Sequence, residues 1–198
     1  MKVELLHNTP LEVADIAISK CYGKEPYKDL TKQQSRINRV ANVSKHSSTI
    51  EHLVYSFDID GISRAVLQEL ARHRIASYTV KSTRYTLKEL RDEDSISENK
   101  YKYIVKTKND DVNIANMSSL FALRNILQEG VPNDIAKYCL PEAYRTALVM
   151  TINARALQNF LALRTDSHAL WEIQDLAKAM YDVIPEEHKF LFENSIKG

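Results

Sequence analysis

Glycine is scarce in this sequence, with only four among 198 residues. Neither of the two common glycine-rich phosphate-binding patterns, GxGxxG and the GxxxxGK sequence followed by serine or threonine, occurs. These loops, whose backbone N–H groups surround the phosphates of a nucleotide, are therefore excluded. Any phosphate group that this protein binds must be held by charged and polar side chains instead.

Cysteine is also scarce. The two thiols, Cys21 and Cys139, have no histidine beside them in the sequence, and a cysteine nucleophile needs a neighbour that stabilises its thiolate. Two such cysteines in a chain of this size are more typical of free, buried thiols than of a disulfide or a catalytic site.

Long apolar runs and a strong net charge are absent as well. No run approaches the roughly 20 residues of a membrane-spanning helix, and the N-terminal segment carries Glu4 and His7 where a secretory signal peptide would be apolar. We therefore expect a cytoplasmic protein. The net charge of +1 offers no general attraction to nucleic acids or membranes, so anion binding must come from a local cluster.

The spacing of apolar residues predicts a largely helical chain with a few strands. Alternating apolar residues predict a strand over 52–60 that ends at Gly61. The apolar and β-branched residues 144–153 form either a strand or the start of a buried helix. Helices are expected over residues 8–23, 30–43, 62–72, 113–130, 131–140, 154–164, 166–184 and 185–194.

These elements indicate a single α+β domain over residues 1–198, with helices packed on a small, mostly antiparallel sheet. The charged residues 88–111 are interpreted as an exposed polar excursion, either a hairpin or a short helix. We expect Thr9 to cap the first helix and Asp166 or Ser167 to cap the helix 166–184.

Positive charge is concentrated between residues 63 and 91, where the sequence has seven Lys and Arg residues and only two Glu. Cations at the end of a helix account for Arg72 and Arg74. If the following stretch is extended, Val80, Ser82 and Arg84 point the same way. A serine hydroxyl and an arginine fork on one face would suit a phosphate or the edge of a pyrimidine, whereas the alternative is a solvated helix end.

A second polar group lies in the apolar segment 151–164. Asn153, Arg155, Asn159 and Arg164 occur there, and the pair Arg155 and Asn159 is adjacent on one face of a helix. Asparagine disfavours a helix interior but forms specific hydrogen bonds, so these residues indicate a binding site, although an ordinary wet helix face would show the same pattern.

A third group precedes the first predicted strand and contains His46, Ser48, Glu51 and His52. Two histidines and a glutamate suggest a metal site, but their order differs from the HExxH zinc motif and no cysteine or aspartate cluster supports it. Capping and packing explain these histidines equally well, and we expect no metal.

Taken together, these three blocks resemble the flavin-dependent thymidylate synthase family. Arg72, His73 and Arg74, followed after seven residues by Ser82, match the RHR-x7-S signature of that family. The segments 46–52 and 152–177 resemble the family's upstream and C-terminal blocks and occur in the same order. The resemblance therefore extends over nearly the whole chain.

The resemblance implies reductive methylation of dUMP to dTMP. In that family 5,10-methylenetetrahydrofolate donates the carbon, NADPH is the reductant, FAD is the bound cofactor and no enzyme nucleophile is needed. It also implies a homotetramer with active sites at subunit interfaces, an α+β fold, and no partnership with a nucleic acid polymer or a membrane.

The resemblance also assigns roles to individual residues of this chain. Arg164 would be the catalytic arginine, held against the uracil ring. The residues expected to bind FAD are His46, Ser48, Glu51, Arg72, His73, Arg74, Val80, Asn153, Ala154, Arg155, Asn159 and His168. The residues expected to bind dUMP are Glu69, Leu70, Ala71, Arg72, Val80, Lys81, Ser82, Thr83, Arg84, Lys137 and Arg164.

Three positions depart from the pattern of many relatives. Glu69 stands where many have Gln, Val80 where many have Glu, and Lys137 where many have Arg. A carboxylate repels phosphate, so Glu69 would contact a sugar hydroxyl or an arginine instead. Lys137 keeps the charge but loses the bidentate fork.

Two other functions remain as alternatives. A small nucleic-acid-binding module could use the arginine cluster with Tyr78 and Tyr85, although the neutral overall charge disfavours it. The second alternative is a protein that binds flavin but has no enzymatic activity.

Overall fold

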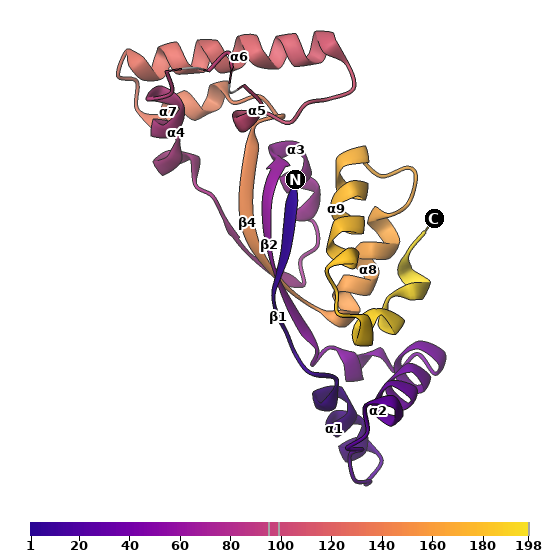
Figure 1. The fold of residues 1–198 in the computed structure, drawn as a ribbon. Helices are drawn as coiled ribbons and strands as arrows, with labels where there is room; N and C mark the ends of the chain where they lie inside the picture. The colour runs from indigo at the N-terminus through magenta and orange to yellow at the C-terminus, as the bar shows by residue number, and fades with distance from the viewer. Residues whose placement is uncertain (95, 99, 198) are drawn as a thin grey trace. The chain divides into compact units, whose positions relative to one another are not determined.

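The computed structural model describes residues 1–94, 96–98 and 100–197, and it has an α+β fold (Figure 1). One antiparallel sheet has the strand order β1-β2-β4-β3. Its strands are β1 (Lys2–Asn8), β2 (Val54–Ser63), β3 (Ala76–Val80) and β4 (Arg145–Asn153). The α+β prediction is therefore confirmed, and residues 144–153 form a strand rather than a helix.

Helices make up most of the remaining chain. The α-helices are α1 (Leu11–Cys21), α2 (Leu30–Ile37), α3 (Arg64–Leu70), α4 (Thr83–Arg91), α5 (Lys100–Tyr103), α6 (Asp110–Gln128), α7 (Asn133–Ala136), α8 (Ala154–Arg164) and α9 (Trp171–Asp182). A π-helix covers Asn38–Val43, and 3-10 helices cover Ser47–Ile50, Lys137–Cys139, Glu186–Leu191 and Glu193–Ser195. In the part of the chain that the structure describes, none of these helices has the length and apolar character of a membrane span.

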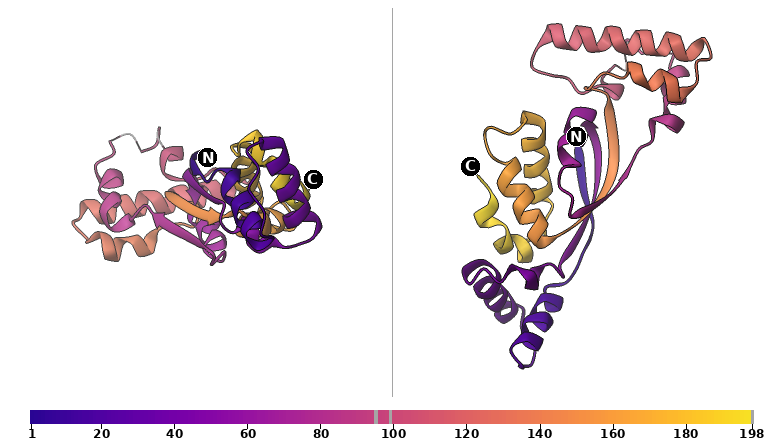
Figure 2. Two further views of the ribbon diagram at one scale, coloured as in Figure 1. Left: turned by 90° about the horizontal axis from the view of Figure 1, so that it is seen from below. Right: turned by 180° about the vertical axis from the view of Figure 1, so that it is seen from behind.

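The chain divides into two compact units. Unit 1 comprises residues 1–59, 69–79 and 149–198, and unit 2 comprises residues 60–68 and 80–148. In unit 1, α8 and α9 lie side by side (Figure 1, Figure 2) and α9 contacts β1. Fully buried aromatic side chains, Tyr55, Phe57, Phe160 and Phe192, dominate its core.

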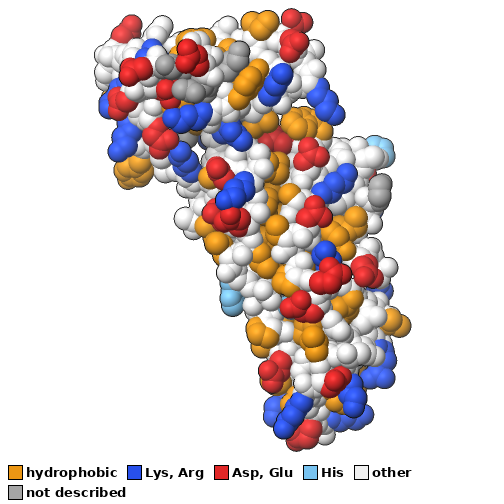
Figure 3. Space-filling view, in the orientation of Figure 1, with side chains coloured by type: hydrophobic (Ala, Val, Ile, Leu, Met, Phe, Trp, Pro, Cys, Tyr) orange, Lys and Arg blue, Asp and Glu red, His pale blue; other side chains and the backbone are white. Residues whose placement is uncertain are grey.

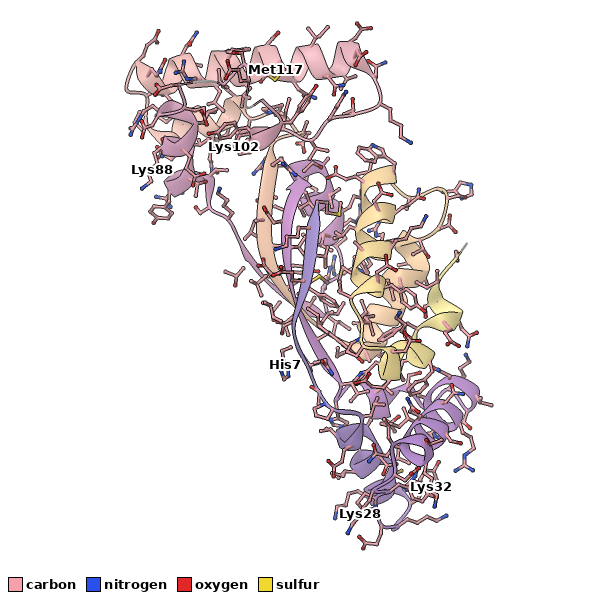
Figure 4. The ribbon with its side chains drawn as sticks, in the orientation of Figure 1. His7, Lys28, Lys32, Lys88, Lys102 and Met117 are labelled. Carbon is pink, nitrogen blue, oxygen red and sulfur yellow. The ribbon has the colours of Figure 1, made fainter. Side chains whose placement is uncertain are left out.

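Unit 2 has its own hydrophobic core, and this corrects the interpretation of residues 88–111 as an exposed excursion. Leu90, Ile96, Tyr103 and Ile104 from that segment are buried in it, beside leucines of α6. In Figure 4, Lys88 lies on α4 and Met117 on α6, the two helices that pack together there. The apolar residues were too widely spaced among charges for a local pattern to reveal that they are buried.

Strand β1 was not predicted from the sequence, and its presence changes the role of Thr9. Instead of capping α1, whose N-cap is Pro10, the Thr9 hydroxyl accepts a hydrogen bond from the Val54 amide at 3.1 Å. The Thr9 amide donates to the Val54 carbonyl at 2.9 Å. Thr9 therefore continues the pairing of β1 with β2.

The sequence predicted that the strand ends at Gly61. This prediction is wrong, because β2 continues to Ser63. The Gly61 φ of 78° lies in the left-handed region, which glycine adopts without the clash of a Cβ atom. A Cβ built there would also come within 3.0 Å of the Arg145 Cζ atom. Glycine therefore suits this position, where the Arg145 side chain packs closely and donates to the Tyr101 carbonyl at 2.9 Å.

Three smaller expectations were also wrong. The stretch is not extended as far as Arg84, because Ser82, although extended itself, is the N-cap of α4 and Arg84 lies in the first turn of that helix. Helix α9 begins after Leu170, with no side-chain cap from Asp166 or Ser167. The cysteines are free as expected, but Cys21 and Cys139 are exposed rather than buried.

Candidate active site

Unit 1 contains a cavity of about 740 Å³, a size typical of small-molecule sites. Two segments that are distant in sequence line most of it, the turn after α3 and the first three turns of α8. The lining residues are Glu51, Arg72, His73, Arg74, Ile75, Asn153, Arg155, Ala156, Asn159, Leu163 and Arg164.

Local structure explains why α8 presents polar groups to this cavity. Asn153 is extended and its side-chain oxygen accepts a hydrogen bond from the Ala156 amide at 2.9 Å, so it caps the helix. From that start, Asn159 and Leu163 follow Ala156 at intervals of three and four residues, which places the three on one helical face. The cap therefore fixes which side of α8 faces the cavity.

Arg164, at the last turn of α8, is held by two residues of the turn that ends α3. Its Nη1 donates to Glu69 Oε2 at 2.7 Å and its Nη2 donates to the Glu69 carbonyl at 3.1 Å. Its Nε donates to His73 Nε2 at 2.9 Å. The Arg164 side chain is only 16% exposed although it lines the cavity.

His73 is neutral at ordinary pH. Burial, followed by the nearby positive charge of Arg164, lowers its pKa from 6.5 to about 4. Its ring packs edge-on against buried Phe160 with the centroids 4.9 Å apart. Neutral imidazole has one acceptor nitrogen, and here that nitrogen receives the Arg164 Nε–H.

Positive charge dominates the lining of the cavity, which contains four arginines and one glutamate. On the face drawn in Figure 3, by contrast, acidic and basic side chains are mixed. Arg155 donates to Glu51 at 2.6 Å. Within the described residues, neither Arg72 nor Arg74 has an ion pair or a side-chain hydrogen bond, so their paired N–H donors are available to an anionic ligand.

Five of the residues predicted to bind FAD do not line this cavity. His46 and Ser48 lie at the 3-10 helix Ser47–Ile50, and Ala154 is buried with its amide bonded to the Leu53 carbonyl. His168 is exposed and pairs with Asp166, and Val80 belongs to unit 2. The part that these five play in cofactor binding stays a prediction.

The residues predicted to bind dUMP are divided between the two units. Glu69 to Arg72 and Arg164 belong to unit 1, whereas residues 80–84 and Lys137 belong to unit 2. Within unit 2 the Asn133 side chain donates to the Arg84 carbonyl at 2.8 Å, which joins α7 to the first turn of α4. Lys81 pairs with Glu89 at 3.0 Å.

Three lining residues were missed from the sequence: Ile75, Ala156 and Leu163. Ile75 is 71% exposed and Leu163 is 52% exposed, which is unusual for such large apolar side chains. The helical spacing of Ala156, Asn159 and Leu163 could have shown that they share a face. A planar aromatic ligand would find apolar contacts at these positions beside the arginines.

No group of three or more His, Cys, Asp and Glu side chains arranged to hold a metal ion was found in the described ranges. The histidines and glutamate of segment 46–52 are thus not gathered into such a group.

Comparison with known proteins identifies relatives over the full length. A family model described as "Thymidylate synthase complementing protein" matches residues 4–188, which include all of unit 2 and most of unit 1. A protein of Wolinella succinogenes named flavin-dependent thymidylate synthase is 52% identical over 198 residues, covering 97% of each chain. A protein of the same name from Campylobacter jejuni is 50% identical, covering 99% of this chain and 98% of the other.

A solved structure is also similar to this chain. The crystal structure of thymidylate synthase X from Helicobacter pylori with FAD and dUMP superposes with a TM-score of 0.94 at 46% sequence identity. The similarity covers 100% of both chains.

Proposed function

The chain belongs to the flavin-dependent thymidylate synthase family, and we propose that it methylates dUMP to dTMP with FAD as its bound cofactor. In this proposal 5,10-methylenetetrahydrofolate donates the carbon and NADPH is the reductant. The observation that carries it is the cavity of unit 1. Two arginines of the RHR motif and two of α8 line this cavity together, namely Arg72, Arg74, Arg155 and Arg164.

The residues of this cavity fit a dinucleotide cofactor. The chain has no glycine-rich phosphate loop, but Arg72, Arg74 and Arg155 present guanidinium forks that suit a diphosphate. Asn159 adds an amide, and Ile75 adds apolar surface for a flat ring system. When bound, reduced FAD supplies the hydride that this chemistry requires.

Arg164 is the candidate catalytic residue. A guanidinium beside O2 and N3 of the uracil ring would stabilise negative charge that develops there during reaction at C5 and C6. One preorganised donor of this kind typically contributes about 3–4 kcal/mol to transition-state stabilisation. Because Glu69 and His73 already orient Arg164, little reorganisation is needed when the substrate binds.

We assign no nucleophile to the protein. A serine without a neighbouring base is a poor nucleophile, and Ser82 has no such partner in the sequence signature. Cys21 and Cys139 are exposed, and neither lines the cavity of unit 1. Methylation is therefore expected to proceed without a covalent enzyme adduct.

From the family resemblance, Arg84 and Lys137 are expected to contact the phosphate of dUMP, and Arg72 is expected to contribute to the affinity for dUMP. We further propose, from the family resemblance, that the active protein is a cytoplasmic homotetramer whose subunits meet at the active sites. The large exposed apolar side chains Ile75, Tyr85 and Tyr138 support this, because such surface is commonly covered by a partner. Light scattering combined with size exclusion would measure the assembly.

The decisive experiment measures the visible absorption spectrum of the purified protein before and after dUMP is added, followed by a turnover assay for dTMP. A flavin spectrum that dUMP perturbs, with dTMP formed in the presence of the folate and NADPH, is expected. Arg164→Ala should keep FAD and lose most of the turnover. A fully active Arg164→Ala variant would show that the catalytic role belongs to another group.

Binding to nucleic acid was the rival function, and the comparisons give it no support, since the relatives described above carry the name of an enzyme. A colourless protein that binds RNA with a steep salt dependence would reverse this conclusion.

A further inference from the structure

We infer that His73 and Glu69 are positioning residues for Arg164, which together hold its guanidinium in one plane and leave two N–H donors for the substrate. This inference rests on the proposed function, because it takes Arg164 as the group that touches uracil. It assigns both residues to Arg164, whereas the contact of His73 with FAD and that of Glu69 with dUMP stay predictions.

The donor inventory of Arg164 supports the inference. A guanidinium has five N–H groups in a rigid planar fork. His73 accepts from Nε, the Glu69 carboxylate accepts from Nη1 and the Glu69 carbonyl accepts from Nη2. These contacts approach from more than one side and prevent rotation of the fork. One N–H on Nη1 and one on Nη2 then remain, on a side chain that lines the cavity.

His73 is itself held in place by contacts of its ring and of its backbone carbonyl. Phe160 packs against the imidazole edge-on, and it lies one helical turn before Arg164 on α8. The Tyr78 hydroxyl lies 2.7 Å from the His73 carbonyl and 2.9 Å from the Leu70 carbonyl. Phe160 therefore supports the imidazole from α8, and Tyr78 of β3 supports the backbone of the turn.

The proton on His73 has a defined place in this arrangement. Since Nε2 accepts from Arg164, the ring carries its proton on Nδ1. A protonated imidazole would have no acceptor and would repel the guanidinium, so the arrangement requires the neutral ring. The depressed pKa of His73, caused by burial and by Arg164, agrees with this requirement.

Glu69 contributes an acceptor as well as a charge. Its side chain is 38% exposed, so much of its attraction to Arg164 is screened by solvent. The acceptor oxygen is therefore the more important property. Gln at this position would keep an oxygen at the same reach, whereas Ala would remove it.

The test compares His73→Leu with His73→Gln and Glu69→Ala with Glu69→Gln in the full-length enzyme. We expect His73→Leu and Glu69→Ala to lower kcat about 100-fold and to change the KM for dUMP less than about threefold. The Gln variants should recover kcat to within about tenfold of the wild type, because they restore the acceptor. The flavin spectrum should be retained in all four.

Matched controls are His7→Leu and Glu12→Ala, which change exposed residues of unit 1 outside the cavity. His7 is labelled on β1 in Figure 4. Both controls should retain the kcat and the thermal unfolding temperature of the wild type.

Three outcomes would overturn the inference, two of them kinetic and one in the retention of FAD. An unchanged kcat in His73→Leu would show that the acceptor is dispensable. Gln variants no better than Leu and Ala would show that shape alone matters. Loss of FAD from His73→Leu would return the residue to cofactor binding.

A crystal structure of His73→Leu separates this inference from the proposed function. Rotation or disorder of the Arg164 guanidinium supports positioning by His73 even if the wild type fails to make dTMP, in which case only the proposed function fails. An Arg164 side chain left in place would refute the positioning whatever the activity.

Discussion

Arg155 donates a hydrogen bond from Nη1 to Oε1 of Glu51 at 2.6 Å, and so connects α8 to the turn after the 3-10 helix Ser47–Ile50. The two side chains are 58% and 42% exposed. Exposed pairs of this kind contribute at most about 1 kcal/mol to stability. The pair is therefore better explained by what it offers a ligand in the cavity than by its contribution to folding.

Replacement of Arg155 by alanine should weaken FAD binding with little effect on stability. A charge-assisted hydrogen bond contributes about 1.5–3 kcal/mol, so we expect the Kd for FAD to rise roughly tenfold to a hundredfold. Fluorescence titration of the apoprotein measures it, with Arg39→Ala, an exposed arginine outside the cavity, as the control. Equal affinities in the two variants would remove Arg155 from the cofactor site.

Arg84→Lys tests the predicted contact with the dUMP phosphate. Lysine keeps the positive charge but loses the bidentate fork, so the KM for dUMP should rise about tenfold, corresponding to one lost charged hydrogen bond. FAD affinity should not change. Arg91→Lys on the same helix is the control, because the Arg91 side chain pairs with Asp92. Unaltered dUMP kinetics in Arg84→Lys would contradict the assignment.

A buried ion pair in unit 1 should be essential for stability. Asp15 is fully buried and its Oδ1 lies 3.0 Å from Arg36 Nε, outside hydrogen-bond alignment, while its Oδ2 accepts from the Tyr27 amide at 2.7 Å. Arg36 also lies over the Tyr27 ring at 3.7 Å. Removing one member of such a pair leaves the other charge buried and costs about 3–5 kcal/mol.

Asp15→Ala is therefore expected to lower the free energy of unfolding by that amount in urea titrations. Lys28 and Lys32 lie near the same helix pair (Figure 4) but are exposed, and Lys32→Ala should shift stability by no more than about 0.5 kcal/mol. Similar midpoints for Asp15→Ala and Lys32→Ala would mean that the ion pair is not a net stabiliser.

Stability should fall as the pH is lowered below about 6.5. Burial lowers the pKa of His188 and, with Arg164, lowers that of His73 to about 4. Each ring is neutral in the folded state and gains a proton on unfolding, so the stability it provides is complete above its unfolded pKa of 6.5 and is lost towards its lower folded pKa. Protonation would also leave the His188 ring with no acceptor nitrogen, although the Tyr55 hydroxyl lies 2.7 Å from Nδ1 and the Asn8 side-chain nitrogen lies 3.4 Å from Nε2.

The measurement is urea unfolding at a series of pH values from about 7 to about 4.5. Each such histidine adds up to about 1.4 kcal/mol per pH unit to the slope. His188→Gln should flatten the dependence, whereas His7→Leu, at an exposed position, should leave it unaltered. A slope that His188→Gln does not change would assign the acid sensitivity to other groups.

Local patterns predicted the elements well where the pattern was strong. Helix α8 follows the predicted range 154–164, and α6 and β4 occur where apolar spacing indicated them. Element ends were less predictable, because a cap depends on neighbours in space. Thr9 bonds to a distant strand instead of α1, and Gly61 lies within a strand that continues beyond it.

The sequence by itself determined the family signature, the lack of a glycine-rich phosphate loop, and most helices, because these depend on residue type and short spacing. Only the tertiary structure decided that unit 2 has a core of its own and that Arg164 is joined to Glu69 and His73, which precede it by 95 and 91 residues. Periodicity reports which face of an element is apolar. It carries no information about which distant face or turn meets that element, because this is decided by packing of the whole chain.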